Sequence, residues 1–254
     1  MLTLRQKMDV VHRAWRYRLK TERVEIALVR DLISPGDIVL DIGAHKGAFS
    51  YWMAKSVGKQ GRVLAFEPIP ELVEYLNDVS DWLNLNIDVY GYALSDKAGR
   101  QKIYFPGHHM GSATLNSTSS VFHEPIEIPK RVLDEVLLSE SGLKPISFIK
   151  CDVEQHENSV LRGSLEILKR DRPILLTESG NLVTGRETNK AVFDLLGSIG
   201  FEGLFVHRNK LVRLSDYDPA KHEVDVNANQ NFVFYHRKSV TWENLSRPFR
   251  ISRK

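Results

Sequence analysis

Apolar and polar positions follow two different rhythms along the chain. Short apolar runs predict buried strands at residues 38–42, 62–66, 87–92, 146–151 and 173–177. Between these runs, apolar residues at helical spacing predict helices at residues 48–57, 70–83, 132–138, 159–168 and 189–199. Strands that alternate with helices are typical of a parallel sheet with helices on both faces, so the pattern predicts an α/β fold.

Both ends of the chain depart from this alternation. Residues 4–32 carry apolar side chains at helical intervals, which predicts one or two amphipathic helices before the first strand. The runs listed next indicate strands with no helix between them, typical of an antiparallel edge: residues 203–207, 211–214 and 231–235. We therefore expect a helical extension over residues 1–35, a main domain over 36–237 and a basic tail over 238–254.

Composition places the chain among ordinary globular proteins, with 42% hydrophobic and 26% charged residues. No run of about 18 apolar residues occurs, so we expect no transmembrane segment. Cys151 is the single cysteine, which excludes an internal disulfide framework and is typical of a reducing compartment. A cytoplasmic location is the expectation, and Cys151 itself fits a buried strand position better than a nucleophile.

Charge is concentrated at the two ends. Residues 1–30 hold eight Lys or Arg against three acids, and residues 237–254 hold six against one. Basic ends on an acidic body suit contact with nucleic acid, anionic lipid or an anionic carrier, but such ends are also common as solvated segments. We favour solvated segments, do not expect nucleic acid as a partner, and leave the oligomeric state open.

The loop after the first strand carries the first candidate chemistry. Gly43 and Gly47 bracket a tight strand-to-helix turn, Asp41 stands at its mouth, and Glu67 ends the next strand, where an acid can accept hydrogen bonds from a ribose. The spacing G-x-x-x-G lacks the dinucleotide fingerprint, which disfavours an NAD-linked oxidoreductase. Asp41 would repel a pyrophosphate but attract an amino group. S-adenosylmethionine, with a ribose, a cationic amino-acid end and no phosphate, suits both acids.

The chain resembles the FkbM-type S-adenosylmethionine-dependent methyltransferases in four ordered segments: D-I-G-A-H-K-G-A-F, A-F-E-P-I-P-E, A-L-S-D, and F-I-K-C-D-V-E-Q-H-E with V-L-R-G. The likeness spans about residues 36–237, which would be the methyltransferase domain. It implies a Rossmann-like class I fold with a seven-stranded, mostly parallel sheet whose last strand is antiparallel. It also implies O-methylation of a hydroxyl on a sugar, polyketide or related small natural product. The alternative is a non-catalytic adaptor that binds nucleic acid or anionic membrane through the basic termini.

The resemblance also assigns cofactor residues. The implied set is Asp41, Gly43, Ala44 and Gly47 in the cofactor loop, Glu67 at the ribose, and Ala93 and Asp96 near the adenine, with a turn residue as the other interpretation of Asp96. Two positions depart from the family: Gln155 stands where a glycine is usual, and Cys151 where a branched apolar residue is usual. We expect Gln155 to restrict the backbone and to alter the acceptor pocket.

A dense group of ionisable residues follows the strand at 146–151. Asp152, Glu154 and His156 share one side of an extended chain, and Glu178 lies at the same depth on the next strand. Asp152, Glu154 and Glu178 offer oxygen ligands for Mg²⁺, a second candidate cofactor. His156 is the candidate base that deprotonates the acceptor hydroxyl, with Asp152 and Glu154 as further catalytic candidates. The other interpretation is that Asp152 orients the methionine end of the cofactor and that Glu154 braces the next helix.

A polar loop at residues 107–120 is longer than most connections. Such loops are often binding loops or lids, although a mobile linker is the other interpretation. Its His108 and His109 are second candidates for the base.

Overall fold

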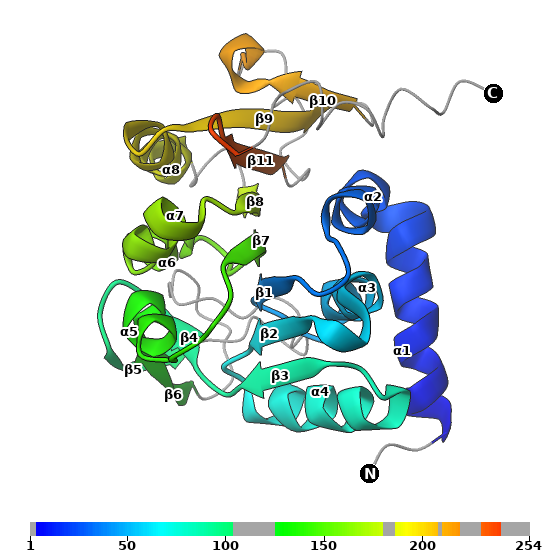
Figure 1. The fold of residues 1–254 in the computed structure, drawn as a ribbon. Coiled ribbons are helices and arrows are strands. Elements are labelled where there is room, and N and C mark those ends of the chain that lie inside the picture. The colour runs from blue at the N-terminus through cyan, green and yellow to red at the C-terminus, as the bar shows by residue number, and fades with distance from the viewer. Residues whose placement is uncertain (1–3, 104–124, 180–185, 208–209, 219–229, 240–254) are drawn as a thin grey trace, which may run out of the picture.

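The computed structural model describes residues 4–103, 125–179, 186–207, 210–218 and 230–239 (Figure 1). Its centre is a sheet in which the described residues form eight strands in the order β10-β9-β11-β8-β7-β1-β2-β3. The strands are β1 (Ile38–Ile42), β2 (Arg62–Phe66), β3 (Ile87–Tyr90), β7 (Ile146–Cys151), β8 (Ile174–Ser179), β9 (Phe201–His207), β10 (Lys210–Arg213) and β11 (Gln230–His236). Neighbouring strands from β8 to β3 are parallel, whereas β11 is antiparallel to both β8 and β9. The predicted mostly parallel α/β sheet is confirmed.

Helices cover both faces of this sheet, as predicted (Figure 1). One side carries α1 (Leu4–Arg16), α2 (Arg23–Leu32), α3 (Ala48–Val57) and α4 (Pro70–Leu83); the other carries α5 (Leu133–Leu138), α6 (Glu157–Arg162), α7 (Leu165–Asp171) and α8 (Arg186–Ser198). Short turns η1 (Tyr17–Thr21), η2 (Gly58–Gln60) and η3 (Leu214–Asp216) complete the described helices. Successive strand residues point to opposite faces, so Val39 joins the first hydrophobic cluster and Leu40 the second.

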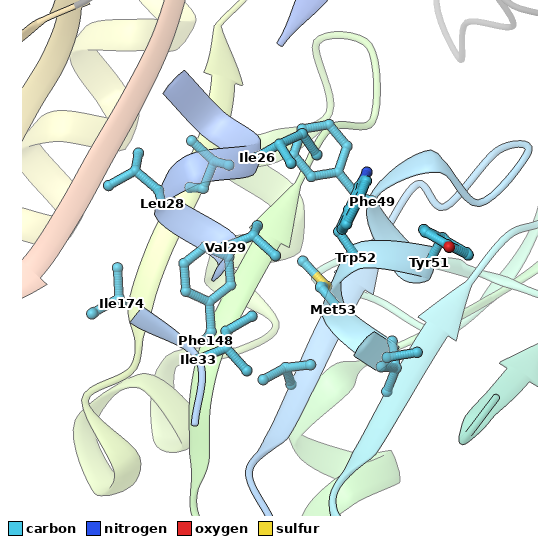
Figure 2. Close-up of a cluster of buried hydrophobic side chains, with 14 of the residues drawn as sticks. Ile26, Leu28, Val29, Ile33, Phe49, Tyr51, Trp52, Met53, Phe148 and Ile174 are labelled. Carbon is cyan, nitrogen blue, oxygen red and sulfur yellow. The ribbon is translucent and has the colours of Figure 1, made fainter. Parts of the chain in front are cut away.

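The helices before β1 share the core of the first face. Figure 2 shows Ile26 and Val29 of α2 packed beside Trp52 and Met53 of α3. The indole Nε1 of Trp52 also donates a hydrogen bond to the carbonyl of Ala14 in α1 at 2.9 Å. Each large side chain buried in this way stabilises the fold by about 1.5–3 kcal/mol. The N-terminal helices are therefore packed firmly onto the sheet domain.

Two predictions need correction. The implied seven strands become eight in the described residues, because β10 pairs with β9 as an antiparallel edge strand. The single helix predicted at residues 159–168 is instead the pair α6 and α7, which breaks at Gly163 and Ser164. A new helix begins there because the carboxylate of Asp134 accepts hydrogen bonds from the N–H groups of Glu166 and Ile167, both at 2.9 Å.

A second, smaller sheet was largely missed. It contains β4 (Ala93–Leu94), β5 (Gly99–Ile103) and β6 (Ile126–Arg131) in the order β4-β6-β5. The polar loop at 107–120, with His108 and His109, lies outside the described residues. In the part of the chain that the structure describes, no helix is long and apolar enough to cross a membrane.

Candidate functional site

A cavity of about 440 Å³ lies at the carboxyl ends of β1, β2, β7 and β8. The strand order reverses between β1 and β7, which is the usual ligand position in a parallel sheet. The predicted residues that line it are Gly43, Ala44, Glu67, Ala93, Asp152, Glu154, His156 and Glu178. Asp41, Gly47 and Asp96 are not among its lining residues. The sequence thus located the cavity, and three of its assigned residues lie outside the lining.

The two loop glycines are required for different contacts. Gly43 has φ +80°, and a Cβ there would lie 1.8 Å from the backbone oxygen of Asp152, so only glycine lets the two strand ends approach. Gly47 has φ +74°, and its Cβ would lie 2.7 Å from Cδ2 of Leu76. Gly43 therefore shapes the cavity wall, whereas Gly47 allows α3 to begin against α4.

Asp41 lies fully buried below the cavity. Its Oδ2 accepts a hydrogen bond from the hydroxyl of Ser50, while Oδ1 has no hydrogen-bond partner among the described residues. Burial raises the pKa of Asp41, and the charge of Lys150, whose Nζ lies 3.9 Å from Oδ1, opposes that rise. Asp41 does not line the cavity, and its charge faces the cavity wall at Lys150.

Glu67 has the fixed geometry expected of a ribose acceptor. Its Oε2 accepts the backbone N–H of His45 at 2.8 Å and its Oε1 that of Ile69 at 2.9 Å. Burial raises the pKa of Glu67 to about 7, against the effect of these two hydrogen bonds. Each oxygen keeps a second lone pair, so the carboxylate can accept two hydroxyl donors from the cavity.

His45 also lines the cavity and was not singled out from the sequence. Its Nε2 is buried without a hydrogen-bond partner among the described residues. Burial lowers the pKa of His45 to about 4, so the ring is neutral at physiological pH. A buried ring nitrogen without a partner inside a cavity is suited to a hydrogen bond with a bound ligand.

Lys150 is the most informative residue that sequence reasoning missed. It is buried on β7, with Nζ 3.0 Å from Oδ2 of Asp152 and 4.7 Å from the ring centroid of Phe49. Burial alone lowers the pKa of Lys150, but the charges of Asp152 and Asp41 raise it above its ordinary value. A permanent positive charge therefore lies in the cavity wall. The signal was a lone lysine inside the apolar run at residues 146–151.

The predicted metal ligands Asp152, Glu154 and Glu178 line the same cavity, but the pKa values of the two glutamates favour their protonated forms. Burial and the charge of Asp152 raise the pKa of Glu178 to about 9, and the same causes raise that of Glu154 to about 7. Within the described residues, no three His, Cys, Asp or Glu side chains are arranged to hold a metal ion. Because the ammonium of Lys150 already supplies the positive charge beside Asp152, the site does not fit the predicted Mg²⁺, and we derive no step through a metal.

His156 lines the cavity in a fixed orientation. Its Nε2 lies 3.0 Å from the hydroxyl of Ser95, which is itself buried. Ser95 is held because its backbone N–H donates to Arg131 and its carbonyl packs against Gly163. Burial, aided by the charge of Lys130, lowers the pKa of His156 and leaves the ring neutral near neutral pH. Ser95 of the A-L-S-D segment thus packs against Gly163 of the V-L-R-G segment.

The turn after Asp152 has the restricted backbone expected at Gln155. Glu154 has φ +53° and Gln155 has φ +74°, a left-handed conformation that glycine adopts without steric cost. The side chain of Glu157 holds this turn, since its Oε1 accepts the N–H groups of Val153 at 3.1 Å and Gln155 at 3.3 Å. The turn therefore persists although its residues do not favour it.

The N-terminal segment supplies a cavity wall that the sequence did not reveal. Arg13, Tyr17 and Glu22 line the cavity. Asn231 on β11 donates hydrogen bonds to Glu22 at 3.1 Å and Glu25 at 2.9 Å, and burial raises the pKa of both carboxyl groups. Residues that are more than 200 positions apart thus meet at one end of the cavity.

Comparisons with known proteins agree with this geometry. The methyltransferase FkbM domain model matches residues 41–202. The chain is 26% identical over 233 residues to the 2-O-methyltransferase NoeI of Sinorhizobium fredii, covering 82% of this chain and 94% of that protein. It is 28% identical over 160 residues to the hexuronic acid methyltransferase AglP of Haloferax volcanii, covering 63% of each. The solved FkbM methyltransferase of Methylobacillus flagellatus is similar in fold, with a TM-score of 0.50 and 16% identity over 92% of this chain and 56% of that one.

Proposed function

Because the chain belongs to the FkbM family of S-adenosylmethionine-dependent methyltransferases, we propose that it methylates a hydroxyl of a sugar or another small hydroxylated natural product. Two relatives support a sugar hydroxyl as the acceptor, since one is named a 2-O-methyltransferase and the other a hexuronic acid methyltransferase. The observation that carries the proposal is the neutral His156 held in a cavity rich in hydrogen-bond acceptors. A non-catalytic adaptor is not favoured, because the family match indicates an enzyme.

The cofactor side of the cavity fits S-adenosylmethionine. When bound, this cofactor supplies an electrophilic methyl group on a positively charged sulfur. Glu67 would accept the ribose hydroxyls, and the bare backbone of Gly43 allows close approach. Lys150 would meet the carboxylate of the amino-acid end, and His45 offers its ring nitrogen as a further contact.

The acceptor side supplies the base. His156 would take the proton of the acceptor hydroxyl, so that its oxygen becomes the nucleophile for the methyl group that the cofactor would supply. The hydrogen bond between Nε2 of His156 and the Ser95 hydroxyl orients the imidazole ring, so Nδ1 is the nitrogen that would face the acceptor. Glu154, protonated in part near neutral pH, and Glu178, protonated there, would bind neighbouring hydroxyls as donors or acceptors.

A panel of acceptors tests this proposal. The enzyme and S-adenosylmethionine are incubated with monosaccharides, hexuronic acids, phenols and amines, and NMR locates the new methyl group. We expect methoxy products on the sugars. Methylation of nitrogen, or turnover of phenols alone, would overturn the sugar hydroxyl as substrate while leaving the methyltransferase activity intact.

Replacing His156 tests its role as the base. His156→Gln should lower kcat about 100-fold or more, because proton removal by a positioned base contributes that much. Calorimetry should show unchanged S-adenosylmethionine affinity. His12→Gln is the matched control, since His12 is exposed on α1, lies outside the cavity lining and should keep near-normal kcat when replaced. Full turnover by His156→Gln would remove this residue from the mechanism.

A further inference from the structure

The outward side of α1 and η1 exposes an apolar stripe. Met8 is 65% exposed, Trp15 41% and Leu19 58%. Their spacing of seven and four residues places them on one side of a helix. In Figure 1, α1 lies at the outer edge of the molecule, beyond α3 from the sheet. Contiguous apolar residues at a surface are typical of interaction sites.

This stripe belongs to a helix that is anchored from its other side. Val10 and Ala14 are buried, and the Ala14 carbonyl accepts the indole N–H of Trp52. Arg13 donates a hydrogen bond to the hydroxyl of Tyr75 on α4 at 3.3 Å. The ring of Trp15 also packs edge to face against Trp52, with centroids 5.3 Å apart, so the helix stays on the domain and Met8 and Leu19 are the most exposed apolar side chains of the stripe.

Cations flank the stripe. Arg16 and Lys20 are exposed beside it. The guanidinium of Arg18 lies 4.8 Å from the ring centroid of Trp15, which adds a charge on its other side. Asp9 is the one acid among residues 1–21 of the sequence. The outer face of α1, which continues over η1 and is defined by Met8, Trp15, Arg16, Leu19 and Lys20, is thus both apolar and strongly positive.

We propose that the outer face of α1 docks the enzyme on a membrane surface rich in anionic lipid headgroups. A helix that lies in the membrane interface combines aliphatic and Trp side chains on one face with flanking Lys and Arg, as here. Each cation near such a surface strengthens binding, because the anionic leaflet carries a negative potential.

Other occupants of this face are less suited to it. A second copy in a two-fold interface would bring Arg16 and Lys20 against their own equivalents, since such an interface pairs a surface with itself. Nucleic acid would satisfy the cations, but the aliphatic Met8 and Leu19 cannot stack on bases as aromatic side chains do. An anionic lipid surface satisfies both the charges and the aliphatic groups.

Vesicle sedimentation of the full chain tests the proposal. Phosphatidylcholine vesicles are compared with vesicles that also contain phosphatidylglycerol, at low and high salt. We expect binding to the anionic vesicles that weakens with salt. Met8→Ser/Leu19→Ser and Arg16→Glu/Lys20→Glu should each lower the vesicle partition coefficient about tenfold or more. Unchanged thermal unfolding and S-adenosylmethionine affinity would show that both variants fold.

Matched controls change the same chemistry elsewhere. Leu138→Ser removes an exposed apolar side chain on α5, and Lys59→Glu reverses an exposed charge on η2; both should bind vesicles like the wild type. Equal binding to both vesicle types, or wild-type binding by both α1 variants, would overturn the proposal. So would a dimer in light scattering that Met8→Ser/Leu19→Ser dissociates, or tighter binding to duplex DNA than to anionic vesicles.

Discussion

The two sides of the cavity are held in place by different forces. On the β1–β2 side, backbone groups fix the residues: Glu67 accepts two backbone N–H bonds, and Gly43 packs against the Asp152 carbonyl. On the β7–β8 side, side chains interact through charge: Lys150 lies between Asp152 and Asp41, and burial and the charge of Asp152 raise the pKa of Glu178. Backbone geometry persists through a change of one side chain. A charge-held group instead depends on every member, and therefore also on pH.

Removing Lys150 should break the charge-held side with the largest effect. Lys150→Met leaves Asp41 and Asp152 with no cation between them, and breaking a buried pair in this way costs about 3–5 kcal/mol of unfolding free energy. Chemical denaturation measures this loss. Lys169→Met, which removes a solvent-exposed pair with Glu166, is the control and should cost within about 0.5 kcal/mol. A Lys150→Met loss as small as that of the control would mean that the cluster stabilises itself by other means.

Removing the charge of Glu67 tests the backbone-held side. Glu67→Gln keeps the shape of the side chain but weakens its bonds to a ribose, so S-adenosylmethionine affinity should fall about 10- to 100-fold in calorimetry. Unfolding free energy should change by about 1–2 kcal/mol, because one backbone N–H loses its carboxylate partner. Glu71→Gln, exposed at the start of α4, should alter neither. Unchanged cofactor affinity in Glu67→Gln would show that Glu67 does not bind the ribose.

The contrast between backbone-held and charge-held residues also explains which site residues the sequence predicted. Strand ends can be read from apolar runs, and parallel strands place their carboxyl ends at one edge, so Glu67, Asp152 and Glu178 were located together. The glycines were recognised as turn residues because their backbone freedom is local. Positions that follow from local pattern and sheet topology were therefore predictable.

What was missed depends on contacts distant in sequence. The wall formed by Arg13 and Glu22 requires α1 to pack on α3, and Glu22 and the start of α2 to meet Asn231 on β11, which no local pattern specifies. Asp96 follows a strand as expected, yet its loop turns outward and leaves it exposed. The role of Lys150 depends on two carboxylates from different strands. Burial and charge pairing of this kind are properties of the tertiary structure.

The dependence of the unfolding free energy on pH should distinguish the two sides of the cavity further. The pKa of Glu178 is raised by burial from 4.5 to about 9, so the folded state binds the additional proton and unfolding free energy falls as pH rises between these values. Between pH 8 and 9 Glu178 contributes at most about 1.4 kcal/mol per pH unit to this fall, because the carboxyl groups whose pKa is raised to about 7 have mostly titrated by pH 8: Glu22, Glu67, Glu154 and Glu157. Denaturation at pH 7, 8 and 9 measures it. Glu178→Gln should flatten the slope, whereas the exposed-site variant Glu74→Gln should retain it; equal slopes in both would contradict the shift.

The smallest expected effect lies where the two sides meet, at the turn after Asp152. Gln155 has φ +74°, and this conformation costs a residue with a side chain about 1–2 kcal/mol. Glycine avoids that strain but loses more chain entropy on folding, so Gln155→Gly should raise the unfolding free energy by about 1 kcal/mol. Asn84, at φ +48° after α4, is the matched control; asparagine tolerates this conformation, so Asn84→Gly should gain less. Denaturation of both variants measures the difference. If Gln155→Gly is instead destabilising, the Gln155 side chain must stabilise the turn by more than its backbone strain, and the charge-held side would then include it.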